Sequence, residues 1–275
     1  MQGAAVIPAN TGITFPLTAA DGAAVKAFAA GKGHTILEPD ALAVETKSSW
    51  VEAMSVADPA SYVQTTAIVP TFNTSDPNNW IHFGQKAVKL VMVGVHVVGS
   101  TKGHGEMVWG SFEHADNAPN ATYKYNSTTG LKTVTQNTAG SWTFTPSGSG
   151  GPFNAMKASW NGTAITGPPV APSAVIRAFP WGTIGTNTSL NTQVISANAS
   201  VLSQLVAGDV RKSYFQVGTT WTIGGAAPSG GNEVGTNQLA NATIETFAQG
   251  TNCFSCHFTS KVAVSHIYWE LKPLP

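Results

Sequence analysis

A long apolar stretch and its neighbour constrain the fold of this chain more than any other feature. Residues 86–98 (KAVKLVMVGVHVV) are rich in valine and match a buried β-strand. Residues 106–113 (EMVWGSFE) form a second β-prone stretch, and the Gly-rich residues 99–105 between them supply a flexible connection. Two strands joined by so short a connection pair antiparallel, because a parallel pair needs a much longer crossover. The sequence therefore predicts an antiparallel pair of strands over residues 86–113.

Other segments extend this β-rich pattern. Strands are predicted over residues 41–50, 62–69 and 214–223, where polar and bulky or β-prone residues follow one another. Apolar residues at helical spacing predict a helix over 195–206, and residues 239–247 form a candidate for a second short helix. We therefore expect a mainly β protein with an antiparallel β-sandwich or barrel-like core and a few short helices.

The composition along the chain predicts three parts of one continuous domain. Residues 1–117 form the β-rich N-terminal part of the core. Residues 118–192 are rich in Ser, Thr, Asn and Gly and form a β excursion or a small lobe. Residues 193–275 form a closing helix–strand–helix segment, which also carries both cysteines of the chain.

The charge balance excludes several classes of partner. Charged residues make up only 10% of the 275 residues, well below the roughly 25% of an average soluble domain. Lys+Arg and Asp+Glu number 14 each, and no basic run is interleaved with aromatic residues, so nucleic-acid binding has no support. The longest apolar run is of strand length, too short for a membrane span. A neutral polar surface of this kind is typical of exported bacterial proteins, and we expect a periplasmic or extracellular location.

The two cysteines give the strongest functional signal. They stand in the motif Cys253-Phe254-Ser255-Cys256-His257, and C-x-x-C-H is the attachment pattern for c-type haem. On a helical turn, residues three apart lie on one face, so both thiols can reach the two vinyl groups on one porphyrin edge. His257 then follows as the proximal iron ligand. The sequence predicts one covalently attached haem c.

Three other interpretations of the motif remain open. A redox-active disulfide would suit a thioredoxin-like context, which the surrounding sequence lacks. A zinc site would combine Cys253, Cys256, His257 and His266, but His257 follows Cys256 too closely for comfortable tetrahedral geometry. A structural disulfide would close a loop too small to stabilise the fold much.

Several segments together resemble a family of exported bacterial c-type cytochrome-like proteins. These proteins carry W-x-x-F-E-H-x-D-N-x-P after an apolar strand with a histidine, and C-x-x-C-H near the C-terminus. The resemblance covers roughly residues 40–120 and 195–271. It implies haem binding and export, but it implies no particular reaction. The matching segments here are Glu45–Trp50, Val93–Val98, Trp109–Pro119 and Leu239–Phe247.

The ligand at the sixth iron position is the main open question in the sequence. His96, His114 and His266 are the candidate distal ligands. His96 alternates with valines in the predicted buried strand, and His114 stands beside two acidic residues. For both, a hydrogen-bonded structural histidine is the simpler explanation. His266 could bind the iron, but it could as easily pack in an aromatic cluster with Tyr268 and Trp269.

Four further residues are candidates for contact with the porphyrin. Arg177 and Arg211 are the only arginines, and guanidinium groups suit haem propionates, although a random surface arginine is the simpler explanation for either. Trp109 and Trp269 are the tryptophans nearest to the family segment and the haem motif. We expect them to pack on the porphyrin, whereas tryptophans in general are core residues.

These observations favour a periplasmic or secreted monohaem cytochrome that transfers one electron at a time. A redox partner protein or an extracellular electron acceptor would then be its partner, and a homo-oligomer is a further possibility. One alternative is a haem enzyme of peroxidase or oxygenase type, with an open sixth iron position. Another is an extracellular binding or assembly protein in which the haem is structural.

Overall fold

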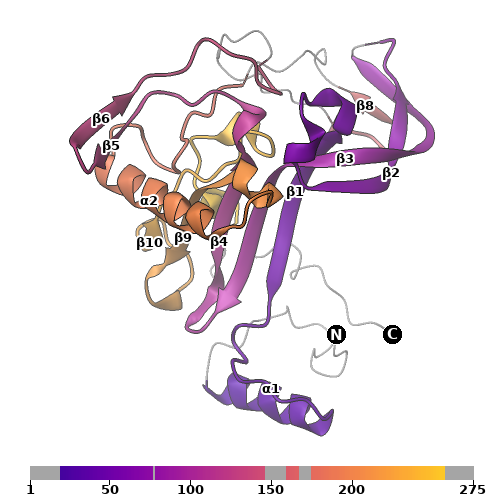
Figure 1. The fold of residues 1–275 in the computed structure, drawn as a ribbon. Coiled ribbons are helices and arrows are strands. Elements are labelled where there is room, and N and C mark those ends of the chain that lie inside the picture. The colour runs from indigo at the N-terminus through magenta and orange to yellow at the C-terminus, as the bar shows by residue number, and fades with distance from the viewer. Residues whose placement is uncertain (1–18, 77, 146–158, 167–174, 258–275) are drawn as a thin grey trace.

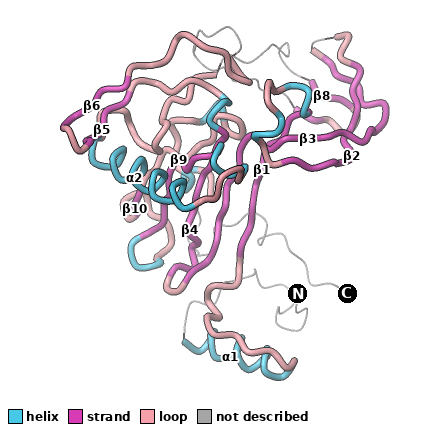
Figure 2. Tube along the Cα trace, viewed as in Figure 1, coloured by secondary structure: helices cyan, strands magenta, loops and turns pink. Residues whose placement is uncertain are grey.

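The computed structural model describes residues 19–76, 78–145, 159–166 and 175–257. The protein is mainly antiparallel β with few helices, which confirms the predicted fold class. Figure 1 shows long central strands with a helix packed on one side and the last described segment of the chain on the other. Figure 2 shows how much of the remaining chain is loop. None of the helices in the described ranges is long and apolar enough to cross a membrane.

In the described part of the chain, eight strands form the main sheet, with β3 at its centre. One path through the sheet runs β10-β9-β4-β3-β8-β7, and β1 and β2 both pair with β3. A separate hairpin is formed by β5 and β6. The strands are β1 (Val44–Glu52), β2 (Gln64–Asn73), β3 (Asn79–Thr101), β4 (His104–His114), β5 (Tyr123–Ser127), β6 (Gly130–Val134), β7 (Ser159–Trp160), β8 (Ala164–Thr166), β9 (Tyr214–Thr222) and β10 (Glu233–Gly235).

The predicted central pair is confirmed as β3 and β4, which pair antiparallel with Val98 opposite Trp109. β3 begins at Asn79, seven residues before the predicted start, because β2 and β8 supply hydrogen-bonding partners for its first part. β2 continues through Pro70, where a strand end was expected. Proline has no N–H to donate to a neighbouring strand. Pro70 is tolerated because β2 pairs only with β3 in the described sheet and is therefore an edge strand.

Both α-helices of the described residues differ from what the sequence predicts. α2 spans Thr188–Gln204 and begins seven residues, about two turns, earlier than predicted, because the Asn187 side chain accepts a hydrogen bond from Leu190 N and caps the helix. α1 (Ala19–Gly31) was not predicted, since its alanines give no clear apolar stripe.

The helix expected over residues 239–247 is wrong. This segment contains turns and a short 3-10 helix, Thr246–Ala248. Asn241 explains the difference, because its side chain accepts hydrogen bonds from the backbone and the hydroxyl of Thr243. Such local side-chain bonds compete with helix formation.

The register of the sheet decides which side chains share a face. Opposite partners in β3 and β4 place Gly94 with Glu113, His96 with Ser111 and Val98 with Trp109. These pairs lie on the face that residues 239–257 cover, as the bonds from this segment to Phe112, Glu113 and His96 show. The alternate residues of β3, such as Val95 and Val97, face α2. One face of the sheet is therefore covered by residues 239–257 and the other by α2.

Candidate functional site

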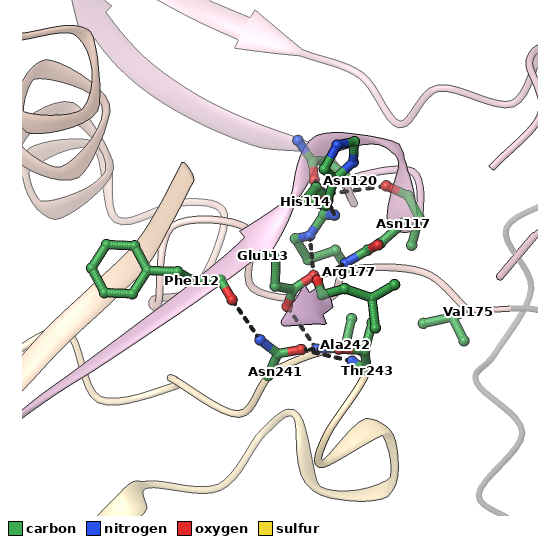
Figure 3. Close-up of polar contacts among 12 residues, drawn as sticks. Phe112, Glu113, His114, Asn117, Asn120, Val175, Arg177, Asn241, Ala242 and Thr243 are labelled. Carbon is green, nitrogen blue, oxygen red and sulfur yellow. Dashed lines mark hydrogen bonds and ion pairs between the residues drawn. The ribbon is translucent and has the colours of Figure 1, made fainter. Parts of the chain in front are cut away.

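The candidate site is built by residues 239–257, which cross one face of β1, β3 and β4. Asn241 Nδ2 donates to the Phe112 carbonyl at 2.9 Å, and Ala242 N donates to Glu113 Oε1 at 2.6 Å, as Figure 3 shows. The crossing point lies over Gly94. A Cβ atom at this position would come within 2.5 Å of Thr243 Oγ1, so only glycine lets the segment lie this close to β3.

Glu245 joins this segment to two strands at once. Its carboxylate accepts a hydrogen bond from Lys47 Nζ at 2.7 Å and contacts His96 Nε2 at 2.8 Å. Burial by itself would raise the pKa of Glu245, but the hydrogen bonds and charges of His96 and Lys47 outweigh that effect and lower the pKa to about 2. Glu245 is therefore an ionised group with partners on β1 and β3.

The C-x-x-C-H motif forms a single 3-10 turn eight residues further along. Asn252 Oδ1 accepts from Phe254 N at 2.9 Å and so caps the turn. Inside it, the backbone N–H groups of Cys256 and His257 both donate to the Cys253 carbonyl, at 3.2 and 3.0 Å. Both cysteines are free thiols; Cys253 is partly buried and Cys256 is exposed. The predicted turn is thus present, with the two sulfur-bearing residues three apart.

Cys253 contacts an apolar cluster under the turn. The cluster consists of Ala43, Val98, Met107, Trp109 and Phe254, contributed by the residue before β1, by β3, by β4 and by the turn itself. Burial raises the pKa of the Cys253 thiol to about 12, and the negative charge of Glu245 adds to this effect. The site therefore favours a neutral sulfur at Cys253 over a thiolate.

Trp109 connects the sheet with the histidine of the motif. Its ring centroid lies 4.5 Å from that of His257 and 5.9 Å from that of Phe254. The indole is buried, and its Nε1 donates to the Glu106 carbonyl at 3.3 Å. Met107, between these two residues, has a φ of 71°, a strained value for a residue with a Cβ. The strand is therefore irregular at the point that supports the motif.

His114 lies deep in the core and is fully occupied by protein contacts. Its ring stacks on Tyr62 at a centroid distance of 3.6 Å. Its Nε2 contacts the Ser61 carbonyl at 3.2 Å, and its Nδ1 accepts from Asp116 N at 3.2 Å. Burial lowers the pKa of His114, so the ring is held neutral. These contacts match the structural alternative for His114.

The two arginines both have carboxylate partners. Arg177 is buried and donates from Nε to Glu113 Oε2 at 2.9 Å, from Nη1 to the Ala118 carbonyl at 3.0 Å and from Nη2 to the His114 carbonyl at 3.3 Å (Figure 3). Arg211 is exposed and pairs with Asp209 at 2.5 Å. Arg211 also lines a groove on the α2 face of the sheet, away from the motif.

The structure thus brings some of the predicted residues together and separates others. Cys253, Cys256, His257 and Trp109 lie at one place, and His96 lies on the same face of the sheet, bonded to Glu245. His114 and Arg177 meet at the other end of β4. His266 and Trp269 lie outside the described residues.

Sequence reasoning missed Glu245 and the role of Lys47. A signal for Lys47 was available, since it belongs to the family segment 45–50 and pairs with His96 across the two strands. Glu245 also lies in a family segment, 239–247, but nothing in the sequence marks it as the partner of Lys47 and His96. Within the described ranges, no three or more His, Cys, Asp or Glu side chains are grouped so that they could hold a metal ion among them.

Comparison with known proteins found no similar protein. No family model matches this chain, and neither the curated proteins nor the solved structures contain a match. The interpretation of the site therefore rests on its own residues and geometry.

Proposed function

We propose that this chain is an exported monohaem cytochrome of the c type, with the haem attached through Cys253 and Cys256 and with His257 as the proximal ligand. One observation carries the proposal. Residues 253–257 form one capped helical turn that presents two free thiols three residues apart, followed at once by a histidine in contact with Trp109. This is the arrangement that attachment to one porphyrin edge requires.

The surroundings of Cys253 fit a thioether better than a zinc site or a redox-active disulfide. A zinc site and thiol–disulfide exchange both need a thiolate. The apolar cluster and the nearby Glu245 charge disfavour a thiolate at Cys253. A thioether is neutral, so it carries no such penalty in the same place. The burial of this sulfur therefore supports haem attachment over metal or redox-disulfide chemistry.

The residues around the motif have defined tasks in this proposal. Cys253 and Cys256 would hold the porphyrin, and His257 would bind the iron, with Trp109 packed against its ring. The bound haem supplies the change between two iron oxidation states that electron transfer needs. His96 shares this face of the sheet, and one of its ring nitrogens contacts the Glu245 carboxylate; metal-ligating histidines commonly have such a partner on the nitrogen that does not bind the metal. His96 is therefore the described candidate that best fits a distal ligand.

Electron transfer is the function that this arrangement supports best. A second side-chain ligand such as His96 would fill the coordination shell, which favours electron transfer over chemistry at an open iron. The low content of charged residues supports an exported protein. The partner would then be a redox protein or an extracellular electron acceptor.

The decisive experiment is expression of the exported chain in a host with active cytochrome c maturation. We expect a red protein with the mass of one added haem and a c-type pyridine haemochrome spectrum. Cys253→Ala or Cys256→Ala should each abolish the two-thioether spectrum, whereas Ser255→Ala, within the same turn, should leave it unchanged. A colourless protein without added mass, obtained while a known cytochrome matures in the same cells, would contradict the proposal.

A second measurement separates electron transfer from an open iron site. The reduced, haem-bound protein is mixed with carbon monoxide. A filled sixth position predicts slow or absent binding, and His96→Ala should then make binding fast. Rapid binding by the unmodified protein would contradict a simple electron carrier and favour the enzyme alternative.

A further inference from the structure

A groove lies between α2 and the sheet, on the face opposite to the C-x-x-C-H turn. Its volume is about 320 Å³, at the lower end of the range typical of small-molecule sites. Val95, Val97 and Phe112 line it from the sheet, and Val201 and Leu202 line it from the helix. Val201 is 58% exposed and Val97 is 38% exposed, so the apolar wall reaches the surface.

The polar groups in the wall of this groove already have protein partners. Tyr214 Oη donates to the Met92 carbonyl at 2.6 Å and accepts from Val63 N at 3.0 Å. Asn198 and Gln216 exchange two hydrogen bonds, at 2.7 and 2.8 Å. A ligand with polar groups along its body would therefore find no partners inside the groove, and an apolar body fits it best.

These same bonds hold the walls in place. The Asn198–Gln216 pair connects α2 to β9, and Tyr214 connects β9 to the backbone at Val63 and Met92. The groove is therefore formed before any ligand arrives, which lowers the entropic cost of binding.

One residue in the lining of the groove carries a positive charge. Of the residues that line the groove in the described part of the chain, Arg211 alone is charged. Asp209 contacts its Nε and Nη2, which leaves Nη1 outside this ion pair. The guanidinium side chain is 69% exposed, so a ligand can approach it from solvent. A carboxylate at the end of an apolar chain would complement this arrangement.

We propose that this groove binds one amphipathic monocarboxylate, such as a medium-chain fatty acid, with its tail between α2 and the sheet and its carboxylate at Arg211. The proposal does not depend on haem binding, because the groove and the C-x-x-C-H turn lie on opposite faces of the sheet.

The test uses sodium decanoate as the probe and isothermal titration calorimetry as the measurement, well below the micelle concentration. We expect saturable binding of one decanoate per chain. Arg211→Gln should weaken decanoate binding about fivefold to tenfold and leave the binding of decanol unchanged. Ala197→Phe, which fills the groove from α2, should weaken both at least tenfold.

The matched control is Ala199→Phe, an exposed position on the same helix that does not line the groove. It should bind decanoate like the unmodified chain, and circular dichroism should show that all three variants keep the fold. Absence of saturable binding would overturn the proposal, as would equal losses in the Ala197 and Ala199 variants. A change from dimer to monomer in Ala197→Phe alone would also overturn it, since a second copy of the chain would then occupy the groove.

Discussion

Glu245 shows how one side chain can fix the position of a functional segment. Its carboxylate meets Lys47 from β1, His96 from β3 and the backbone N–H of Asn241 from its own segment. The Glu245 side chain is 21% exposed and that of His96 is 15% exposed, whereas that of Lys47 is 65% exposed, so the contact with His96 is the more shielded from water. Because Glu245 precedes Cys253 by eight residues, its contacts limit where the C-x-x-C-H turn can lie. The charge of this residue thus contributes to stability and to the placement of the turn.

Glu245 should make the stability of the protein depend on acid pH. Its pKa is lowered from 4.5 to about 2 in the folded protein. A lowered carboxyl pKa stabilises the fold above the unfolded value, and this contribution is lost as the pH falls from about 4.5 towards 2. We expect Glu245→Gln to lower the free energy of unfolding at pH 7 by on the order of 2 to 3 kcal/mol.

Urea denaturation of both proteins between pH 7 and pH 2.5 measures this effect. The difference between them should shrink steadily below pH 4.5. Glu38→Gln, at an exposed position, serves as the control and should change stability little at any pH. A difference between Glu245→Gln and the unmodified chain that stays constant down to pH 2.5 would rule out the ionised pair as its source.

Among the elements of the fold, β3 determines which segments can meet. It pairs with β1, β2, β4 and β8, and Gly94 lies where the segment 239–257 crosses it. The close approach depends on the missing side chain. A Cβ at Gly94 would lie 2.5 Å from Thr243 Oγ1 and 2.6 Å from Asn241 Nδ2. Both atoms belong to the hydrogen-bonded turn that begins the segment, so the segment itself would have to move.

We therefore expect Gly94→Ala to destabilise the protein by about 1 to 3 kcal/mol through overpacking. Hydrogen exchange should show the largest loss of protection within residues 239–257. Gly84→Ala is a matched control on the same strand, because its Cβ would lie 3.4 Å from the nearest atom, Thr71 Oγ1. Equal effects of the two substitutions would show that close packing at Gly94 does not hold the segment.

Across the molecule as a whole, the ion pair of Glu113 and Arg177 joins three distant parts of the chain. Glu113 lies at the end of β4, Arg177 follows in the Ser/Thr/Asn/Gly-rich part, and Ala242 N donates to the same carboxylate (Figure 3). Both charged side chains are buried, at 0% and 4% exposed. A buried pair of this kind is sensitive to the loss of either partner, because the remaining charge has no water around it.

Removal of one partner should therefore be costly. We expect Arg177→Met to lower the free energy of unfolding by about 3 to 5 kcal/mol, measured by urea denaturation. Lys86→Met breaks the exposed pair with Glu52 and should cost no more than about 1 kcal/mol. If the two variants lost equal stability, the buried pair would not be the connection that its contacts indicate.

The local features of this protein follow from short stretches of its sequence. Valine-rich residues 86–98 and their neighbour at 106–113 specify β3 and β4, since short-range pairing needs no distant contact. The Asn252-capped C-x-x-C-H turn also needs only its own residues, so the motif alone was enough to predict the turn. Helical spacing likewise identified most of α2.

Contacts between distant residues, in contrast, depend on the tertiary structure. His96 and Glu245 are 149 residues apart and Glu113 and Arg177 are 64 apart, and their contacts depend on strand register and on the path of the loops between them. The predicted helix over 239–247 was wrong partly for the same reason: besides the local bonds between Asn241 and Thr243, this segment bonds to Phe112 and Glu113, and those bonds are made only once β4 is in place. Helix and strand propensities depend on a few neighbouring residues, whereas tertiary packing brings together residues from any part of the chain.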